Sequence, residues 1–499
     1  MDCKCSSFAF CHKIHFAIRL FAHLYLLPYF CEQIHIDMKK LVFLWCCLAG
    51  LWCQCASAQP WEEEYPRLLN SIQLPVEGRK AVYDIRTYGA RTDAEAEVNQ
   101  KALNAAIKAC SEEGGGKVVV PVGEWKTGAI TMKSHVNLVV DSGAVLQFVF
   151  EPRLYPEVLT HWEGLECYNI SPLIYAHGET DIAITGKGTI DGGGSNSTWW
   201  AWTGVERFGW KEGMYNQKQS RQALTRMSEE GVGVEERRFK DAPMRPQTVN
   251  FMFCQRVLIE GVTLLRSPFW VLHPVMCEDV TVRGVTIINN GPNGDGCDPE
   301  SCNRVLIEDC MFRTGDDCIA IKSGRNADGR RWNVPCQNVI VRNCKMEDGH
   351  GGIVVGSEVS GGFRNLFLEN CQMDSPHLDR VVRIKTSTCR GGVVENVYVR
   401  NVEVGECREA VLKINLDYEP REAARRGFIP TVRNVHLDRV NCRKSKYGAY
   451  IIGLADEEQV YDVKVENCRW TGVETGGNRI DGKVRNVTFD NVQIEATSL

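Results

Sequence analysis

Short runs of alternating apolar and polar residues fill the chain from Lys117 onward, and Gly, Asn and Asp separate them. Alternation with a period of two is typical of β-strands that bury one face. One six-residue pattern recurs nine times, with apolar residues at its first, third and sixth positions and mostly a charged residue at the fourth. Its copies begin at Val257, Val280, Val305, Val339, Leu366, Val397, Val435, Val463 and Val487.

Successive copies of this pattern begin 23, 25, 34, 27, 31, 38, 28 and 24 residues apart. A roughly constant period with extra residues in some copies is typical of a solenoid with loop insertions. We therefore expect an all-β fold, a single-stranded, right-handed parallel β-helix. Because the strict alternation breaks between the fourth and sixth positions, we also expect a bend before the sixth.

The sixth position holds only valine or cysteine. It reads Val262, Val285, Cys310, Cys344, Cys371, Val402, Val440, Cys468 and Val492. An exchange of Cys with Val at one stacked site fits small, buried, apolar side chains. A ladder of packed thiols is therefore favoured over disulfides at these four cysteines.

One helix is expected before the repeats. Leu103, Ala106, Ile107 and Cys110 follow helical spacing within 99–110, and the glycines at 114–116 provide a stop signal. A helix here would cap the open end of the sheet stack, whose exposed edge would otherwise favour aggregation.

The first 58 residues have the composition of a leader rather than of a folded domain. Met38-Lys39-Lys40 is followed by an apolar run and by Ala56-Ser57-Ala58, which together resemble a secretory signal peptide cleaved after Ala58. We expect translation to start at Met38, and the protein to be exported to the periplasm or the extracellular space. Residues 59–499 are expected to form one β-helix domain, in which the Trp-rich segment at about 195–246 is a loop insertion or lid.

The charge balance argues against a nucleic-acid partner. The chain carries 58 Lys and Arg against 63 Asp and Glu, a formal net charge of −5. An anionic ligand would therefore need a local cluster of cations. After Ala58, no apolar run approaches the roughly 20 residues of a membrane span, and no Cys or His cluster has zinc spacing, so we expect no membrane span, no metal and no cofactor.

Three acidic residues lie among glycines on two successive repeats. Asp295 precedes the adjacent pair Asp316 and Asp317 by about one coil, so the carboxylates should face one another on neighbouring coils. Alone, an adjacent Asp pair is more typical of a turn or a calcium ligand. Neighbouring strands lie about 4.7–4.9 Å apart, and side-chain reach could widen the gap toward the roughly 6.5–9.5 Å of an inverting glycosidase pair.

A histidine and two basic residues follow at similar intervals. His350, between two glycines, lies 33 residues after Asp317, and Arg383 lies 33 residues after His350. Arg383 and Lys385 are two positions apart in a strand, so both side chains emerge on one face. They would supply the local cation cluster, and arginine can bind a uronate carboxylate through paired hydrogen bonds.

Four segments in this order resemble the motifs of the pectin-degrading polygalacturonases of glycoside hydrolase family 28. They are Asn293-Gly294-Asp295, Gly315-Asp316-Asp317-Cys318, Gly349-His350-Gly351 and Arg383-Ile384-Lys385. The entry segments Tyr88-Gly89-Ala90 and Gly188-Thr189-Ile190-Asp191-Gly192 also resemble that family, so the likeness spans nearly all of 83–490. One departure is that the first motif usually has Thr where this chain has Gly294.

The resemblance implies hydrolysis of α-1,4-linked galacturonate with inversion. Asp316 would act as general acid, and Asp295 and Asp317 would together activate water. His350 would support the site, while Asn293, Arg383 and Lys385 would bind substrate. Like charges raise a carboxyl group's affinity for its proton, so one protonated acid beside two carboxylates is physically reasonable.

Two other functions fit the fold. A pectate lyase would need calcium ligands and a base, and a non-catalytic polysaccharide-binding β-helix would not need the three acids. The expected partner is an acidic polysaccharide or oligosaccharide, either homogalacturonan, rhamnogalacturonan or a branched pectin, bound by a monomer. Exo attack is favoured over endo attack, because the 195–246 insertion and the enlarged repeats after 305 and 397 could close one end of the groove.

Overall fold

The structure is a computed structural model, and it describes residues 60–76 and 78–497. Tyr65–Leu499 forms one compact unit, whereas the π-helix η1 (Pro60–Glu64) belongs to a separate one. The signal peptide and cleavage site expected within 1–58 lie outside the described residues. No helix of the described chain is long and apolar enough to cross a membrane.

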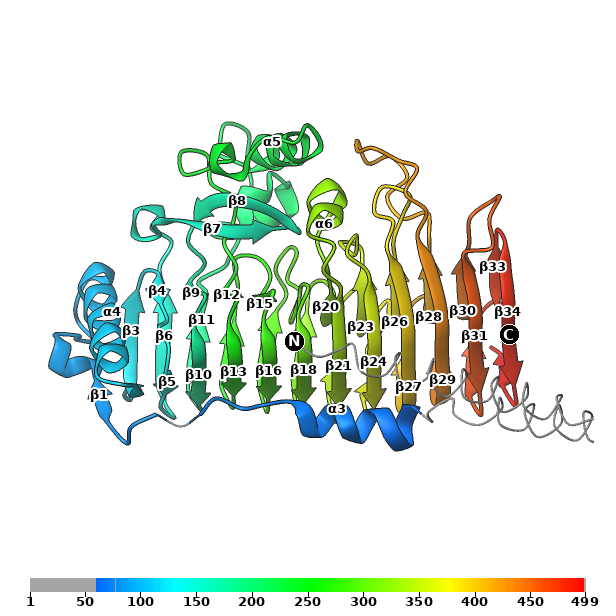
Figure 1. The fold of residues 1–499 in the computed structure, drawn as a ribbon, viewed down its shortest axis with the longest axis horizontal. Coiled ribbons are helices and arrows are strands. Elements are labelled where there is room, and N and C mark those ends of the chain that lie inside the picture. The colour runs from blue at the N-terminus through cyan, green and yellow to red at the C-terminus, as the bar shows by residue number, and fades with distance from the viewer. Residues whose placement is uncertain (1–59, 77, 498–499) are drawn as a thin grey trace, which may run out of the picture. The chain divides into compact units, whose positions relative to one another are not determined.

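The unit is a right-handed parallel β-helix, as the repeat predicted, and its strands form three rows along the stack (Figure 1). The first row holds β1 (Val82–Asp84), β2 (Gly116–Val120), β5 (Val136–Val140), β10 (Thr180–Gly186), β13 (Gln255–Glu260), β16 (Glu278–Arg283), β18 (Asn303–Glu308), β21 (Cys336–Arg342), β24 (Phe363–Glu369), β27 (Val393–Glu406), β29 (Thr431–Lys444), β31 (Val460–Glu466) and β34 (Val484–Asp490).

The second row follows the bend in each coil. It holds β3 (Gly123–Thr127), β6 (Ala144–Phe148), β11 (Thr189–Asp191), β14 (Thr263–Leu265), β17 (Thr286–Asn289), β19 (Met311–Thr314), β22 (Lys345–Met346), β25 (Gln372–Met373), the later halves of β27 and β29, β32 (Arg469–Val473) and β35 (Gln493–Ala496).

The third row carries the candidate site. It holds β4 (Ile130–Thr131), β9 (Ile174–His177), β12 (Val249–Met252), β15 (Leu272–Val275), β20 (Ile319–Ile321), β23 (Ile353–Gly356), β26 (Arg380–Lys385), β28 (Ala410–Asn415), β30 (Tyr447–Ile452) and β33 (Arg479–Asp481). Between β15 and β20, isolated bridges at Cys297 and Glu300 continue the row.

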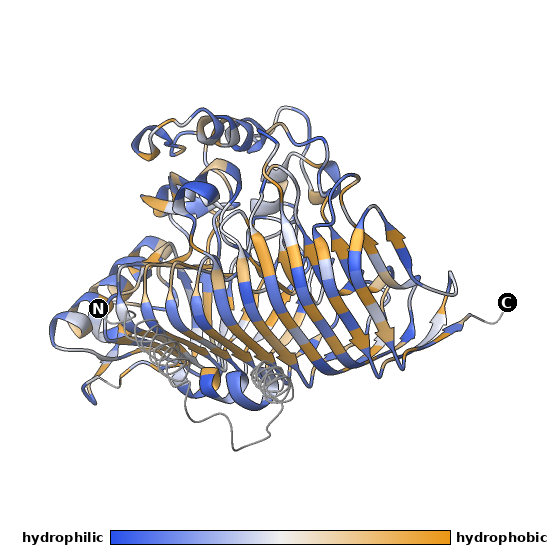
Figure 2. Cartoon of the chain, turned by 45° about the vertical axis from the view of Figure 1, so that its right-hand side comes forward, coloured by the Kyte–Doolittle hydropathy of each residue, from blue (hydrophilic) through white to orange (hydrophobic). Residues whose placement is uncertain are grey.

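The six-residue repeats stack in the register that the sequence predicted. Val257 pairs with Val280, Val280 with Val305, and Val305 with Val339. Along the strands, hydrophobic and hydrophilic residues alternate (Figure 2), and the first-position valines from Val257 to Val463 are 0–1% exposed. Each coil therefore buries the same positions on the coil before it.

The expected bend falls at the fifth position of each copy, where the backbone takes a positive φ. The residues there are Gly261, Gly284, Asp309, Asn343, Asn370, Asn401, Arg439, Asn467 and Asn491, with φ between 52° and 76°. Gly, Asn and Asp adopt this left-handed conformation more readily than other residues. One residue of each repeat thus determines where the first row ends and the second begins.

The thiol ladder is confirmed. All fifteen cysteines of the described chain are free and buried, and Cys310, Cys344, Cys371 and Cys468 at the sixth position are 1–2% exposed. They occupy the same core cluster as the valines with which they exchange.

The predicted capping helix is present as α4 (Ala96–Glu112). Leu103, Ala106, Ile107 and Cys110 are fully buried, so the helix lays its apolar face on the first coils. The chain then turns at Gly114, where φ is 95°.

Loops of very different length lie beside the third row (Figure 1). The predicted 195–246 insertion folds into η4 (Trp199–Thr203), η5 (Glu206–Phe208), α5 (Lys218–Glu229) and η6 (Val234–Glu236), and α6 (Asn326–Trp332) lies in the enlarged repeat after 305. The antiparallel hairpin of β7 (Glu157–Trp162) and β8 (Leu165–Ile170) was not expected from the sequence. Short 3-10 turns, η2 (Ile85–Tyr88) and η3 (Pro152–Leu154), occur near the start of the unit.

An N-terminal strap, residues 65–76, runs along the outside of the coils from α3 (Tyr65–Ser71) (Figure 1). The Tyr65 hydroxyl donates to Glu369, at 2.5 Å. Further along, the backbone amides of Gln73 and Val76 donate to Asp279 and Asp181. The strap therefore ties together coils that lie far apart in the stack.

Candidate active site

The three predicted acids meet at the start of two neighbouring third-row coils. The Gly296 amide donates to the Asp317 carbonyl at 3.0 Å, which places Asp295 and Asp317 side by side. One carboxylate oxygen from each of Asp295, Asp316 and Asp317 lies within 4.8 Å of the others. This spacing is shorter than the roughly 6.5–9.5 Å between the carboxyl groups of an inverting pair, so an attacking water would have to lie beside the acids rather than between them.

Two glycines allow the backbone to place these acids. A Cβ on Gly294 would lie 2.6 Å from the carbonyl oxygens of Asn289 and Gly291, and one on Gly315 would lie 2.5 Å from the Gly291 carbonyl. Neither site has room for a side chain without movement of the backbone. This close packing explains why Gly294 stands where the first motif usually has Thr.

His350 contacts the middle acid. Its Nδ1 lies 2.9 Å from Oδ1 of Asp316, and its backbone amide donates to the Asp316 carbonyl at 3.2 Å. The Asp316 side chain is 19% exposed, whereas those of Asp295 and Asp317 are 5% and 0% exposed. Of the three acids, Asp316 is therefore the one best placed to reach a ligand.

Arg383 and Lys385 both face the site, as their spacing predicted. Nζ of Lys385 lies 2.8 Å from Oδ2 of Asp317, and a guanidinium nitrogen of Arg383 lies 3.4 Å from Oδ1. A Cβ on Gly351 would lie 3.2 Å from Asp317 Oδ1, so this glycine leaves room for the buried carboxylate. The two cations hold Asp317 in place and leave donors on Arg383 for a further anion.

The residues around the site give Asp295 and Asp316 different proton affinities. Burial raises the pKa of Asp295 well above its usual value, and the negative charges of Asp316 and Asp298 raise it further. Burial also acts to raise the pKa of Asp316, but the hydrogen bond from His350 and the charges of Lys385 and Arg383 outweigh it and lower that pKa to about 2. The same hydrogen bond raises the pKa of His350. The unliganded site therefore favours a proton on Asp295 and a His350–Asp316 ion pair.

Asn293 lies at the edge of the site. Its side-chain oxygen accepts a hydrogen bond from the buried Arg245 at 2.7 Å, and Arg245 also donates to the carbonyls of Pro292 and Pro268. Arg245 thus braces the loop before Asp295 from within the insertion. Arg245 itself was not identified from the sequence.

Tyr418 is a second residue that the sequence did not reveal. The Arg383 guanidinium lies 5.5 Å and the Lys385 ammonium 5.3 Å from the centre of its ring, within the range of cation–π contacts. It follows β28 in one of the enlarged repeats. Since this tyrosine stands outside the four motifs, only its place beside the two cations identifies it.

One coil after Asp295, a buried lysine joins several acids. Nζ of Lys322 lies 3.1 Å from Glu358, 3.5 Å from Asp298 and 3.9 Å from Asp295. It also lies 4.3 Å from the centre of the Trp270 ring. Lys322 lies five residues after Asp317, but nothing in its spacing distinguished it from a solvated strand residue.

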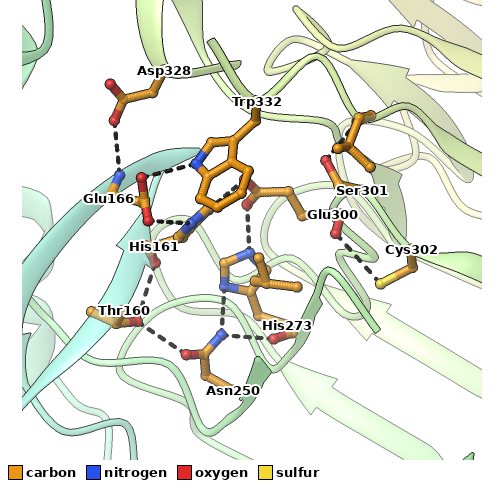
Figure 3. A network of polar contacts seen from close by, with 12 residues as sticks. Thr160, His161, Glu166, Asn250, His273, Glu300, Ser301, Cys302, Asp328 and Trp332 are labelled. Carbon is orange, nitrogen blue, oxygen red and sulfur yellow. Dashed lines mark hydrogen bonds and ion pairs between the residues drawn. The ribbon is translucent and has the colours of Figure 1, made fainter. Parts of the chain in front are cut away.

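A buried polar network lies next to these residues (Figure 3). Glu300 accepts from Nδ1 of His161 and from Nε2 of His273, both at 2.8 Å. Burial alone would lower the pKa of His161, but Glu300 outweighs it and raises that pKa, whereas burial lowers the pKa of His273. Glu300 is therefore charged and paired with His161, and the hairpin that carries His161 is fastened to the third row.

The acid cluster is also the kind of arrangement that can ligate a cation, since one oxygen of each acid could reach a single ion. Asp317, however, already has two cationic partners, Arg383 and Lys385. A metal would have to displace or lie against these charges. The donor set therefore suits proton transfer and anion binding better than it suits a divalent cation.

Comparisons with known proteins point to one family. The model described as glycosyl hydrolases family 28 matches residues 230–452. A probable polygalacturonase of Vitis vinifera is 30% identical over 317 residues, which cover 61% of this chain and 57% of that protein. An exo-poly-alpha-D-galacturonosidase of Dickeya chrysanthemi is 25% identical over 455 residues, covering 85% and 73%. The crystal structure of a hyperthermoactive exopolygalacturonase from Thermotoga maritima superposes with a TM-score of 0.79 at 38% identity, covering 85% of this chain and 95% of that one.

Proposed function

The chain belongs to glycoside hydrolase family 28, and on this basis we propose that it hydrolyses α-1,4-linked galacturonate in pectin-type polysaccharides. The observation that carries the proposal is the meeting of three carboxylates with His350, Arg383 and Lys385 on successive coils. Carboxylates that can reach the same glycosidic bond provide a general acid and a general base. The adjacent cations provide the charge that a uronate requires.

In the proposed mechanism, Asp316 protonates the leaving glycosidic oxygen, because it is the most exposed of the three acids. A water attacks the anomeric carbon from the opposite face and gives its proton to Asp295 or Asp317. One proton leaves Asp316 and one is gained from water, so the carboxyl groups as a set end with the proton they began with. The products have inverted configuration, and Arg383 and Lys385 hold the sugar carboxylate.

This mechanism requires the proton to move to Asp316 when substrate binds. In the unliganded site the charges of Arg383 and Lys385 help to keep Asp316 ionised. A uronate bound to these two cations neutralises them, which raises the proton affinity of Asp316. The proton then passes from Asp295 to Asp316, leaving Asp295 as a base.

We propose that the enzyme attacks the sugar chain from its end. Beyond the end of β20, Arg325 donates to Glu163 in the β7–β8 turn and to Glu422 in the loop at 416–430, which follows β28, each at 2.8 Å. Arg325 and Glu422 have side chains only 6% exposed. Three segments far apart in the sequence are thus joined by buried charges, and this wall supports an exo-acting enzyme.

A time course on polygalacturonic acid and on oligogalacturonides tests the proposal, with products resolved by size and by ultraviolet absorbance. Saturated galacturonate or a single short product from the outset is the expected result. A range of oligomers before any short product would contradict exo attack, and an unsaturated, ultraviolet-absorbing product would identify a lyase instead. No release from either substrate would overturn the assignment to homogalacturonan and direct the test to branched pectins.

We also propose that the protein is exported and that a monomer acts on the polysaccharide. The signal-like segment that ends at Ala58 supports export. Cell fractionation with N-terminal sequencing tests this, and Gln59 at the mature N-terminus is the expected result. Recovery of the uncleaved chain in the cytoplasm would contradict it.

A further inference from the structure

A column of side chains continues from the site along the third row toward its last strand. Arg383 of β26 pairs in register with Lys413 of β28, Lys413 with Tyr450 of β30, and Tyr450 with Arg479 of β33. Residues in register on successive parallel strands lie about 4.8 Å apart along the stack. The column therefore repeats at about the length of one sugar unit in an extended chain.

Contacts between neighbours hold this column in place. Nζ of Lys413 lies 3.1 Å from the centre of the Tyr450 ring, and the Arg479 guanidinium lies 4.9 Å from the same centre. Tyr450 is thus placed between two cations and fixes their spacing. Lys413 also bonds to Glu409 at 3.0 Å, and Glu409 in turn accepts from Arg380.

The two sides of the catalytic acids differ in charge. On the N-terminal side, Glu300 is matched by His161, and burial raises the pKa of Asp298 well above its usual value.

Five cations lie in or beside the column, and they are Arg380, Arg383, Lys385, Lys413 and Arg479. Four acids of the described chain pair with them, and they are Asp317, Asp379, Glu409 and Asp481. The excess of one cation, with Arg383 and Lys385 sharing a single acid, favours a polyanion on the C-terminal side.

We propose that Lys413, Tyr450 and Arg479 form an extended track for an anionic glycan, with Lys413 and Arg479 binding the carboxylates of uronate units beyond the cleaved bond. This inference rests on the proposed function and deepens it. The N-terminal side, where the β7–β8 hairpin is fastened to the third row through His161 and Glu300, takes one end of the chain. The first unit past the bond lies at Arg383 and Lys385, and later units follow the column. The track explains how an enzyme with a net negative charge holds a polyanion.

The spacing of the column sets how many sugar units an oligomer needs to reach each residue of the column. With one unit on the N-terminal side, a dimer reaches Arg383 and Lys385, a trimer reaches Lys413, and a pentamer reaches Arg479. Arg479 is 49% exposed at its side chain, so its contribution should be that of a surface ion pair. Such pairs give up to about 1 kcal/mol, or about twofold to fivefold in affinity.

The test measures kcat/KM on galacturonate oligomers of two to six units for the protein and three variants. Lys413→Met keeps the stem over Tyr450 and removes the charge, and Arg479→Gln removes the outer cation. The matched control is Arg485→Gln, because Arg485 also lies over a tyrosine ring, 4.4 Å from Tyr461, and beside an acid, Glu458, but on the first row.

We expect kcat/KM to rise with length up to five units in the unchanged protein. Lys413→Met should lose the gain beyond the dimer and Arg479→Gln the gain from four to five units, each by about twofold to fivefold, while Arg485→Gln matches the unchanged protein. Equal kcat/KM at every length, with dimer cleaved, would overturn the track and leave the proposed function standing. If nothing is cleaved, the proposed function fails. Calorimetric binding of the same oligomers to Asp316→Asn then still tests the track, and affinity independent of length overturns it.

Discussion

Nδ1 of His350 lies 2.9 Å from Oδ1 of Asp316, so an imidazolium and a carboxylate from neighbouring coils form an ion pair within the acid cluster. The pair lowers the pKa of Asp316 and raises the pKa of His350. It therefore keeps the most exposed acid charged until a ligand changes the field around it. Burial and the charges of Asp316 and Asp298 raise the pKa of Asp295, which of the three acids is the one without a cation in hydrogen-bonding distance.

Replacing Asp316 by Asn should abolish turnover without preventing binding. The amide keeps the shape of the side chain but cannot protonate the leaving oxygen, and general acids contribute about 10² to 10⁴ in rate. Reducing-end release measures the rate, and calorimetry with an oligogalacturonide measures binding. Asp456→Asn, at an exposed acid, is the control. A rate within a few-fold of the unchanged protein would remove Asp316 from its role.

Replacing Asp295 by Asn should inactivate the protein and stabilise it at neutral pH. The pKa of Asp295 is raised in the folded state, so between about pH 4, where an unfolded Asp ionises, and this higher folded value, only the folded state retains the proton. The free energy of unfolding therefore falls as pH rises through this interval. Asn removes that loss.

Thermal melts at pH 4 and pH 7 measure the effect. The gain of Asp295→Asn over the unchanged protein should be larger at pH 7 than at pH 4, and Asp456→Asn should show no such difference. An equal or smaller gain at pH 7 would mean that Asp295 is ionised in the folded protein.

The parts of this molecule that repeat were predictable from the sequence. Valines such as Val257 and Val280 fix the register because one residue of slippage would turn the buried face outward. Asn343 and Asn370 mark the bend because their side chains tolerate a left-handed backbone. The four motifs likewise brought Asp295, Asp316 and His350 together, since residues one coil apart become neighbours once the coils stack.

Features that depend on a single long-range contact were not predictable. The strands of the β7–β8 hairpin are short and mix apolar with polar residues, so alternation could not distinguish them from further coils. Arg325 and Glu422 are 97 residues apart, and neither lies in a repeat position. Lys322 and Tyr418 stand outside the motifs, and only the folded chain shows that they face the acids and the cations.

The reaction should proceed with inversion although one carboxylate oxygen of each acid lies within 4.8 Å of the others. Asp317 is held by Arg383 and Lys385, so its carboxylate is fixed in place and orients a water beside it instead of moving to the anomeric carbon as a nucleophile. Proton NMR of the first minutes of hydrolysis should show the β-anomer of the newly formed reducing end, ahead of spontaneous mutarotation. An initial α-anomer would indicate a covalent intermediate and retention.

Loosening the wall should change the product pattern. Glu422→Gln removes the charge that both Arg325 and Arg390 bind, leaving two buried arginines short of a partner. We expect the 416–430 loop to detach and internal bonds of polygalacturonic acid to become accessible, so that oligomers appear with the short product. Arg421→Gln, at an exposed residue of the same loop, should keep the original pattern. An unchanged pattern in Glu422→Gln would show that other segments block the groove.

The N-terminal strap should stabilise the unit without affecting catalysis. Tyr65→Phe removes the hydroxyl that donates to Glu369, and a hydrogen bond to a charged group contributes about 1.5–3 kcal/mol. Glu369 keeps its bond from Arg400 at 2.7 Å, so its charge remains paired and the loss should lie near the lower end of that range.

Urea unfolding should show a lower midpoint for Tyr65→Phe with kcat/KM unchanged. Tyr461→Phe, which removes an exposed hydroxyl bonded to Arg433, should leave the midpoint within about 0.5 kcal/mol. Equal midpoints for Tyr65→Phe and the unchanged protein would mean that the strap lies on the coils without stabilising them.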